Sequence, residues 1–415
     1  MHNLKIIEEF LGETKSSTAA YIDVREEQRG VSTTKLPIRL GYARGLMNKL
    51  VMILGAAGTF GSKIAVSLAK TNIHLILAGR TKESLQLLAT NIKAIYPKVL
   101  IDIAVFDIIK EITEQLRYFK PFIIINTCGP FQIADYSIAT TCINFGIHYI
   151  DLADSRKYVC GFHEALNSRA EENNCLAITG ASTVPCLSSA VLEHYKTSFS
   201  KLDGLIFGIS PGQKTERGLA TTTAILSYLG QSFPPYAGTK DKVYGWQDLY
   251  WQTYPIIGKR WMANCEVPDL DLLPQYYGLK SIKFSAGMES NILHFCIWIL
   301  SWCVRLGVIK NLVNYAKPLL KLSHLFDYFG TADGGMHMII SGKDQNNYPK
   351  TIKWFIVARN GDGPHIPTIP AIILTKKLLQ SDVHVKGARA CINLITLAEY
   401  LTELKEYDIK IYYST

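Results

Sequence analysis

The residues best suited to chemistry follow a short apolar run near position 50. Val51–Leu54 precedes three glycines spaced three apart, Gly55, Gly58 and Gly61, and a helical pattern follows from Ser62. A strand, a glycine turn and a helix in this order bring backbone N–H groups and the positive end of a helix dipole to one point, which suits a pyrophosphate. The pattern predicts a dinucleotide site at Gly55, Ala57, Gly58, Thr59, Phe60 and Gly61, and therefore hydride transfer.

The next strand end indicates which dinucleotide is bound. NAD-binding domains carry an acidic residue about 20 positions after the glycines, where it contacts the ribose 2′-hydroxyl. Here Arg80 stands near that place, Lys82 follows, and no acid comes before Glu83. A guanidinium pairs with a 2′-phosphate that a carboxylate would repel. The sequence therefore predicts NADP(H) rather than NAD(H); the alternative is that Arg80 merely ends a strand in solvent.

Strands and helices alternate over the first half of the chain, which predicts a Rossmann-type, doubly wound parallel α/β sheet. After residue 200 the pattern changes to a mixed α+β domain inserted for substrate, followed by helices at 369–379 and 388–403. The expected domains are a loosely packed extension at 1–46, the NADP domain at 47–199, the substrate domain at 200–360 and a helical return onto the first domain at 361–415. The expected strands of the first sheet are 50–54, 73–78, 99–105, 122–126, 147–151 and 175–179, and its helices are 59–70, 82–95, 109–118, 131–145 and 156–172.

Polar and small residues follow several of these strands, where a parallel sheet forms its ligand crevice. Asp107 follows the third strand and is expected on the adenine side. The four residues that directly follow the fourth strand are expected near the nicotinamide half of the dinucleotide. They are Thr127, Cys128, Gly129 and Pro130.

The fifth and sixth strands supply the candidates for catalysis and substrate binding. Asp154, Asp151 and His148 could exchange a proton, although Asp154 could equally cap a helix and His148 fits a buried strand position. Arg156 and Arg217 could hold a carboxylate or phosphate. Ser182 and Thr183 precede a helix start, where hydroxyls serve both as caps and as anion ligands.

The composition excludes several classes of protein. The 415 residues carry a net charge of +9, but the basic residues are scattered, so no nucleic-acid partner is expected. Nine cysteines without a C-x-x-C pair predict reduced thiols in the cytoplasm, and no metal-binding spacing occurs. The apolar stretch 291–304 is too short to span a membrane; a core helix is expected, with peripheral membrane contact as the alternative. A homodimer is left open.

Longer motifs resemble the saccharopine dehydrogenase-like family, in its NADP-binding branch of mostly uncharacterised bacterial oxidoreductases. The matching pieces over about 48–395 include GAAGTFGS, NTCGPFQ, GIHYIDLADSR, TGASTVPCLSSAV and GDGPHIPTIPA. The resemblance implies a Rossmann domain interrupted by a substrate domain, and pyridine-nucleotide redox chemistry. A related branch is similar to trans-acting enoyl reductases, whose substrates are apolar.

These observations together predict an NADP(H)-dependent oxidoreductase acting on C=N, C=O or C=C of a small or lipid-like substrate. An enoyl reductase acting on an acyl chain is one alternative. A non-catalytic NADP-binding sensor or scaffold is the other.

Overall fold

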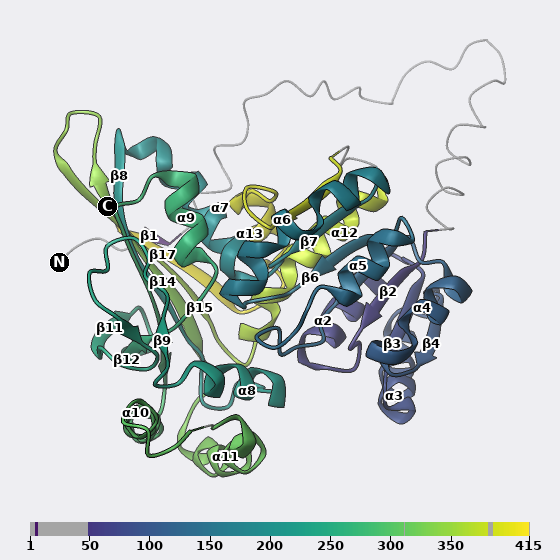
Figure 1. Ribbon diagram of the computed structural model, residues 1–415, viewed down its shortest axis with the longest axis horizontal. Helices are drawn as coiled ribbons and strands as arrows, with labels where there is room; N and C mark the ends of the chain where they lie inside the picture. Colours follow the sequence, from purple (N-terminus) through teal and green to yellow (C-terminus); the bar gives the residue numbers. More distant parts are fainter. Residues whose placement is uncertain (1–4, 7–48, 311, 381–384, 415) are drawn as a thin grey trace, which may run out of the picture.

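The computed structural model describes residues 5–6, 49–310, 312–380 and 385–414 (Figure 1). Most of the predicted extension at 1–46 thus lies outside the described residues. Two sheets organise the described part, and they lie side by side with helices between and around them.

The first sheet has seven strands, all parallel, in the order β16-β7-β6-β5-β2-β3-β4. This order confirms the predicted doubly wound sheet, because the chain starts in the centre at β2 and winds outward in both directions. The strands are β2 (Val51–Leu54), β3 (Leu75–Gly79), β4 (Ile101–Val105), β5 (Ile123–Asn126), β6 (His148–Asp151), β7 (Leu176–Thr179) and β16 (Gly387–Ala390).

Helices cover both faces of this sheet, and the strand residues alternate between two cores. Val51 and Ile53 pack with α2 and α3, whereas Met52 and Leu54 pack with α4, α5 and α6. The alternation follows from the two-residue period of a strand. The helices are α2 (Thr59–Ala69), α3 (Lys82–Ile95), α4 (Ile108–Phe119), α5 (Ser137–Asn144), α6 (Arg156–Glu172) and α7 (Ser188–Tyr195).

Two predicted helices are shorter in the structure. The helix expected over 131–145 begins only at Ser137, because the Asp135 carboxylate accepts the Ser137 N–H at 3.0 Å and fixes a turn there. The helix expected over 388–403 begins at Leu397, after the Thr396 side chain caps it. Residues 387–390 instead pair with β7 as the seventh strand.

The second sheet has eight strands in the order β1-β17-β15-β14-β8-β13-β12-β11. Only β8 and β13 pair in parallel; the other neighbours are antiparallel, as expected for an α+β domain. Its strands are β1 (Lys5–Ile6), β8 (Lys201–Ser210), β11 (Tyr250–Tyr254), β12 (Gly258–Asn264), β13 (Ser281–Met288), β14 (Gly334–Lys343), β15 (Pro349–Ala358) and β17 (Ile409–Ser414), with β9 (Ser232–Phe233) and β10 (Val243–Tyr244) forming a separate ribbon.

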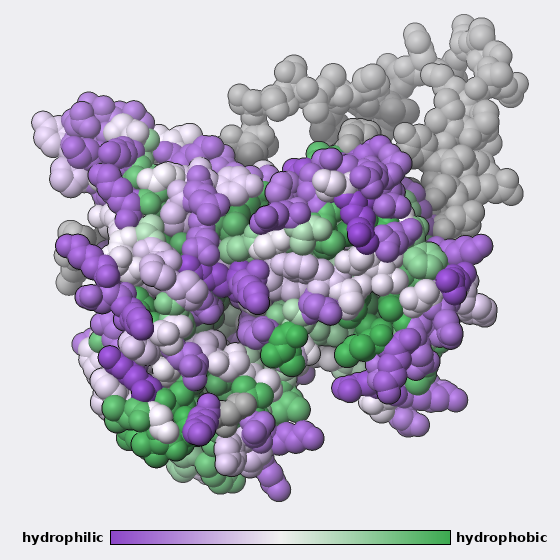
Figure 2. Space-filling model, viewed as in Figure 1, coloured by the Kyte–Doolittle hydropathy of each residue, from purple (hydrophilic) through white to green (hydrophobic). Residues whose placement is uncertain are grey.

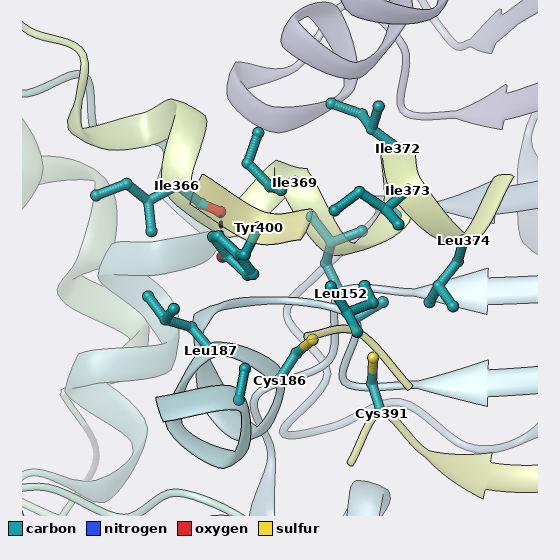
Figure 3. Packing of buried hydrophobic residues seen from close by; sticks show 14 of the residues in the cluster. Leu152, Cys186, Leu187, Ile366, Ile369, Ile372, Ile373, Leu374, Cys391 and Tyr400 are labelled. Atoms are coloured by element: carbon teal, nitrogen blue, oxygen red, sulfur yellow. Dashed lines mark hydrogen bonds between the residues drawn. The ribbon is translucent and has the colours of Figure 1, made fainter. Parts of the chain in front are cut away.

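The C-terminal segment connects the two sheets, since β16 extends the first and β17 joins the second. Helix α12 packs beside the turn η2 and helix α2, and its Ile369, Ile372 and Ile373 belong to the same buried cluster as Leu152 (Figure 3). The Tyr400 hydroxyl donates to the Ile366 carbonyl at 2.5 Å. The remaining helices are α8 (Leu219–Tyr228), α9 (Asp269–Tyr277), α10 (Asn291–Arg305), α11 (Ala316–Ser323), α12 (Ile369–Leu379) and α13 (Leu397–Glu403), with the short turns η2 (Thr183–Leu187), η3 (Lys196–Ser198), η4 (Val313–Tyr315), η5 (His324–Phe329) and η6 (Gly363–Thr368).

Candidate active site between the two sheets

The glycine turn after β2 has the backbone geometry of an anion site. Gly55 has φ +76°, and a Cβ there would lie 2.8 Å from both Thr127 Oγ1 and Cys128 Sγ. Helix α2 then begins behind Gly58 without a side-chain cap and without an acidic residue in its first turn. Its first N–H groups are therefore available to a diphosphate, with the helix dipole favouring negative charge.

Arg80 is the cation that the sequence assigns to the 2′-phosphate. Its side chain is exposed and makes no hydrogen bond or ion pair with a described residue. Burial raises the pKa of the Cys128 thiol to about 12, and the positive charge of Arg80 opposes that rise. The two side chains therefore interact electrostatically at the end of β2. An unpaired guanidinium beside the glycine turn fits a group that carries an extra phosphate.

The other predicted cofactor residues surround the same turn. The Thr127 hydroxyl donates to the Leu54 carbonyl at 2.8 Å, and the Asn126 side chain accepts the Cys128 N–H at 3.0 Å. Gly129 is exposed and joined to Pro130 by a cis peptide bond. The Asp107 carboxylate accepts the Ile109 N–H at 3.1 Å and so caps α4. The contact of Asp107 with the adenine side of the cofactor stays a prediction.

A cavity of about 330 Å³ lies between the two sheets and reaches the glycine turn at Phe60. Thr183 and η6 line it from one side, and the ends of β8, β13, β14 and β15 line it from the other. Its walls are largely apolar, and Thr183, Thr215 and Thr221 bring hydroxyls to it. Its other polar or charged lining residues are Gln213, Glu216, Arg217 and Glu289. The lining includes Phe60, Thr183, Ile209, Thr221, Met288 and Met336.

Glu216 closes this cavity against the first domain. Its carboxylate accepts from the Thr59 hydroxyl at 2.8 Å and from Lys63 Nζ at 3.1 Å, at the start of α2. Burial alone would raise the pKa of Glu216, but these two donors lower it below its usual value. A carboxylate therefore lies beside the helix terminus that suits a phosphate.

Of the four predicted substrate residues, Thr183 and Arg217 line the cavity. Arg217 is held by the Gln213 carbonyl, by Ser323 and by Asp327, so its donors point into the protein. Ser182 directly precedes η2 and is half-buried, with its N–H bound to the Gly180 carbonyl. Arg156 lies elsewhere: Asp271 holds it with two hydrogen bonds, and the Pro234 and Pro235 carbonyls take further donors, an arrangement that supports the fold.

The three predicted catalytic residues are not brought together. Asp151 is fully buried at the end of β6, where Oδ1 accepts from the Thr179 hydroxyl and from the Gly180 and Ala153 N–H groups. Burial raises its pKa to about 6, and those hydrogen bonds limit the rise. His148 lies at the opposite, amino end of the same strand, and its Nδ1 accepts the Leu176 N–H at 3.0 Å.

Asp154 lies beyond the end of β6, outside the cavity lining. Its Oδ1 accepts from Gln132 Nε2 at 3.0 Å, and its charge is felt by Tyr228 and Cys265 of the second domain. Asp154 is exposed to solvent, but protein atoms packed around it raise the pKa of its carboxyl, while the Gln132 hydrogen bond acts in the opposite direction. A proton-transfer role for Asp154 stays a prediction.

Sequence reasoning missed Gln132, Glu216 and most of the cavity lining. Glu216 had one signal, its position two residues before Gly218, the residue that precedes α8. Met288 and Met336 had none, because strand residues facing a cavity have the same pattern as strand residues facing a core.

The fold and the glycine turn define a Rossmann-type dinucleotide-binding domain. Residues 51–178 match the family model described as saccharopine dehydrogenase NADP binding domain. The match covers the first domain, which therefore resembles the NADP-binding domain of the saccharopine dehydrogenase-like family. The Gly55 cradle and the unpaired Arg80 fit that cofactor.

Solved and curated proteins extend the comparison. Apo saccharopine dehydrogenase (L-Glu forming) from Saccharomyces cerevisiae shares the fold with a TM-score of 0.60 at 11% identity, over 88% of this chain and 99% of that one. Short segments are similar to alanine racemases, at 51% identity over 51 residues in Rickettsia felis and 32% over 87 residues in Rickettsia bellii. The aligned segments are 12% and 21% of this chain, and they span only 11% and 21% of the two racemases.

Proposed function

We propose that the chain is an NADP(H)-dependent oxidoreductase acting on a mostly apolar substrate with one polar reacting group. The observation that supports this most is the apolar cavity of about 330 Å³ that begins at Phe60, beside the dinucleotide turn. Pockets of this size and character bind small organic ligands. The proposal therefore places the reacting carbon between the glycine turn and the second sheet.

The chain's own groups would bind and orient the reactants. When bound, NADP(H) supplies or accepts the hydride. The amides at the start of α2 and Arg80 hold the nucleotide, and the cavity walls exclude water and fix the apolar part of the substrate. Thr183 and Thr221 both line the cavity, and the proposal assigns their hydroxyls as hydrogen-bond donors to a carbonyl or imine. Such a donor polarises the bond that receives hydride.

An amino-dicarboxylate substrate is less well supported. Arg217 is the only cation among the described residues that line the cavity, and its donors are taken up by Gln213, Ser323 and Asp327. A doubly charged substrate needs several free cations, because a buried carboxylate without a partner is costly. The apolar lining instead favours an enoyl, ketone or imine group on a hydrocarbon frame.

The test follows NADPH absorbance with enoyl thioesters, ketones and cyclic imines, in wild type and in Thr221→Trp. Thr221 is exposed at the cavity edge, so the indole fills the cavity without disturbing the core. Turnover should fall about tenfold or more, while NADPH affinity stays unchanged. Thr90→Trp, at an exposed position on α3, is the matched control.

Two results would contradict the proposal. One is NADPH binding without turnover of any apolar substrate in the panel, which would favour a sensor or scaffold. The other is reduction of NADP⁺ by amino-dicarboxylates, measured as a separate assay in the reverse direction, that Thr221→Trp leaves intact.

A further inference from the structure

Helices α10 and α11 carry an exposed apolar surface at one end of the second domain. Figure 2 shows apolar side chains gathered where Figure 1 places these helices. We call this surface the apolar tip. Its exposed large side chains include Ile299 and Trp302 of α10, Leu306 directly after it, and Leu325, Tyr328 and Phe329 of η5, the turn that follows α11.

A buried apolar cluster supports the helices of the apolar tip. Leu312 and Ala316 pack into one buried cluster with Val304 of α10 and with Trp246. The outward-facing residues are therefore not a core that failed to close. Tyr328 is 85% exposed and Phe329 is 83% exposed, which costs free energy in water unless a partner covers them.

The charges around the apolar tip select the class of partner. Residues 291–330 contain four basic residues, Arg305, Lys310, Lys317 and Lys321, and one acidic residue, Asp327. Asp327 is neutralised by Arg217, whereas Lys317 and Lys321 are exposed and form no ion pair with a described residue. Aromatic and aliphatic side chains beside lysines match the interface of a bilayer that carries anionic lipids.

We propose that the apolar tip docks the protein on an anionic membrane surface. None of the described helices is long and apolar enough to cross a bilayer, so the contact is peripheral. The side chains of the tip enter the headgroup region, and the lysines pair with lipid phosphates. A second copy of the chain fits less well, because the facing lysines would repel one another.

The same surface connects to the cavity, and this step rests on the proposed function. Gln213 and Arg217, which line the cavity, both bond to the Ser323 carbonyl at the end of α11 and to Asp327 in η5. Docking would therefore hold the cavity wall close to the membrane. A lipid-derived substrate could then enter the cavity without crossing much water.

The experiment is flotation of the full chain with vesicles of phosphatidylcholine alone or of equal parts phosphatidylcholine and phosphatidylglycerol. The expected result is binding to the anionic vesicles that weakens with added salt. Leu325→Ser with Tyr328→Ser and Phe329→Ser should weaken it about tenfold or more. Lys317→Glu with Lys321→Glu should also weaken it about tenfold or more, and only for the anionic vesicles.

The matched control is Ile109→Ser with Tyr118→Ser on α4, where the two side chains are 83% and 79% exposed. This variant should float like wild type. NADPH titration of every variant, without vesicles, should be unchanged, so loss of docking is distinguished from loss of the proposed redox function.

Equal flotation of the apolar-tip and control variants would overturn the proposal. So would no flotation of wild type together with self-association, measured by sedimentation, that the tip variants abolish; that result would assign the surface to a second copy.

Discussion

The dinucleotide turn and the substrate cavity adjoin each other but are built in opposite ways. The turn comes from seven consecutive residues, 55–61, and acts through backbone groups. The cavity draws Phe60, Thr183, Thr221 and Met336 from four distant elements and acts through side chains. The difference teaches that the cofactor depends on local conformation, whereas the substrate depends on how the two sheets pack.

The strongest way to break this contrast is Gly55→Ala. The new Cβ would lie 2.8 Å from Thr127 Oγ1 and Cys128 Sγ, at a φ of +76° that alanine rarely adopts. The turn must shift, so NADPH affinity should fall about a hundredfold or more. Isothermal titration with NADPH measures the loss, and the melting temperature reports any wider damage.

Gly258→Ala is the matched control, because Gly258 also has φ +76° but nothing lies within 4 Å of its added Cβ. Gly258→Ala therefore shows how much stability is lost through the positive φ alone, without the steric clash that the added Cβ makes at Gly55. Equal NADPH affinity in the two variants would show that crowding at the turn is unimportant.

A second prediction concerns how the buried carboxyl of Asp151, at the end of β6, makes the unfolding free energy depend on pH. Burial raises the pKa of Asp151 to about 6, from an ordinary value of about 4 for an aspartate. The folded state therefore keeps its proton longer, so stability falls as pH rises from about 4 to about 6 and then levels off. Relative to Asp151→Asn, wild type should lose about 2 kcal/mol of unfolding free energy across that window.

Urea denaturation at pH 4 and pH 7 measures this difference, with Asp241→Asn at an exposed site as control. NADPH binding is expected to follow the stability change only weakly, because Asp151 lies beneath the crevice. A difference between wild type and Asp151→Asn that does not vary with pH would contradict the buried, partly protonated carboxyl.

The smallest expected effect is at Glu216, which links the cavity to the turn. Its carboxylate accepts from Thr59 and Lys63, near the end of α2 that suits a phosphate. Glu216→Gln removes the negative charge, so NADPH affinity should rise a few-fold, by about 1 kcal/mol or less. Glu193→Gln on α7, remote from the turn, should leave it unchanged. Weaker NADPH binding in Glu216→Gln would show that the carboxylate supports the site.

The sequence was informative where residues act through local backbone. The glycine turn at Gly55 and six of the seven parallel strands followed from spacing and periodicity, whereas the role of Arg80 stays a prediction. The strand at 387–390 was not predicted, because four residues are too few to show the two-residue periodicity of a strand. Most of them were therefore assigned to the helix that in the structure begins only at Leu397. The identity of the strand depends on pairing with β7, some two hundred residues away.

Side-chain roles were harder to predict for the same reason. Arg156 reads as a free cation in the sequence, yet Asp271 binds it across the fold. His148 and Asp151 are three residues apart, yet a strand places them at opposite ends of the sheet. Glu216 gains its position only when the second domain packs on α2.

A crystal structure of the complex with NADP⁺ tests the central claim most directly. The account predicts the diphosphate on the amides at the start of α2, the 2′-phosphate against Arg80, and the nicotinamide facing the cavity that begins at Phe60. A nucleotide bound elsewhere, or one whose nicotinamide is walled off from that cavity, would contradict it.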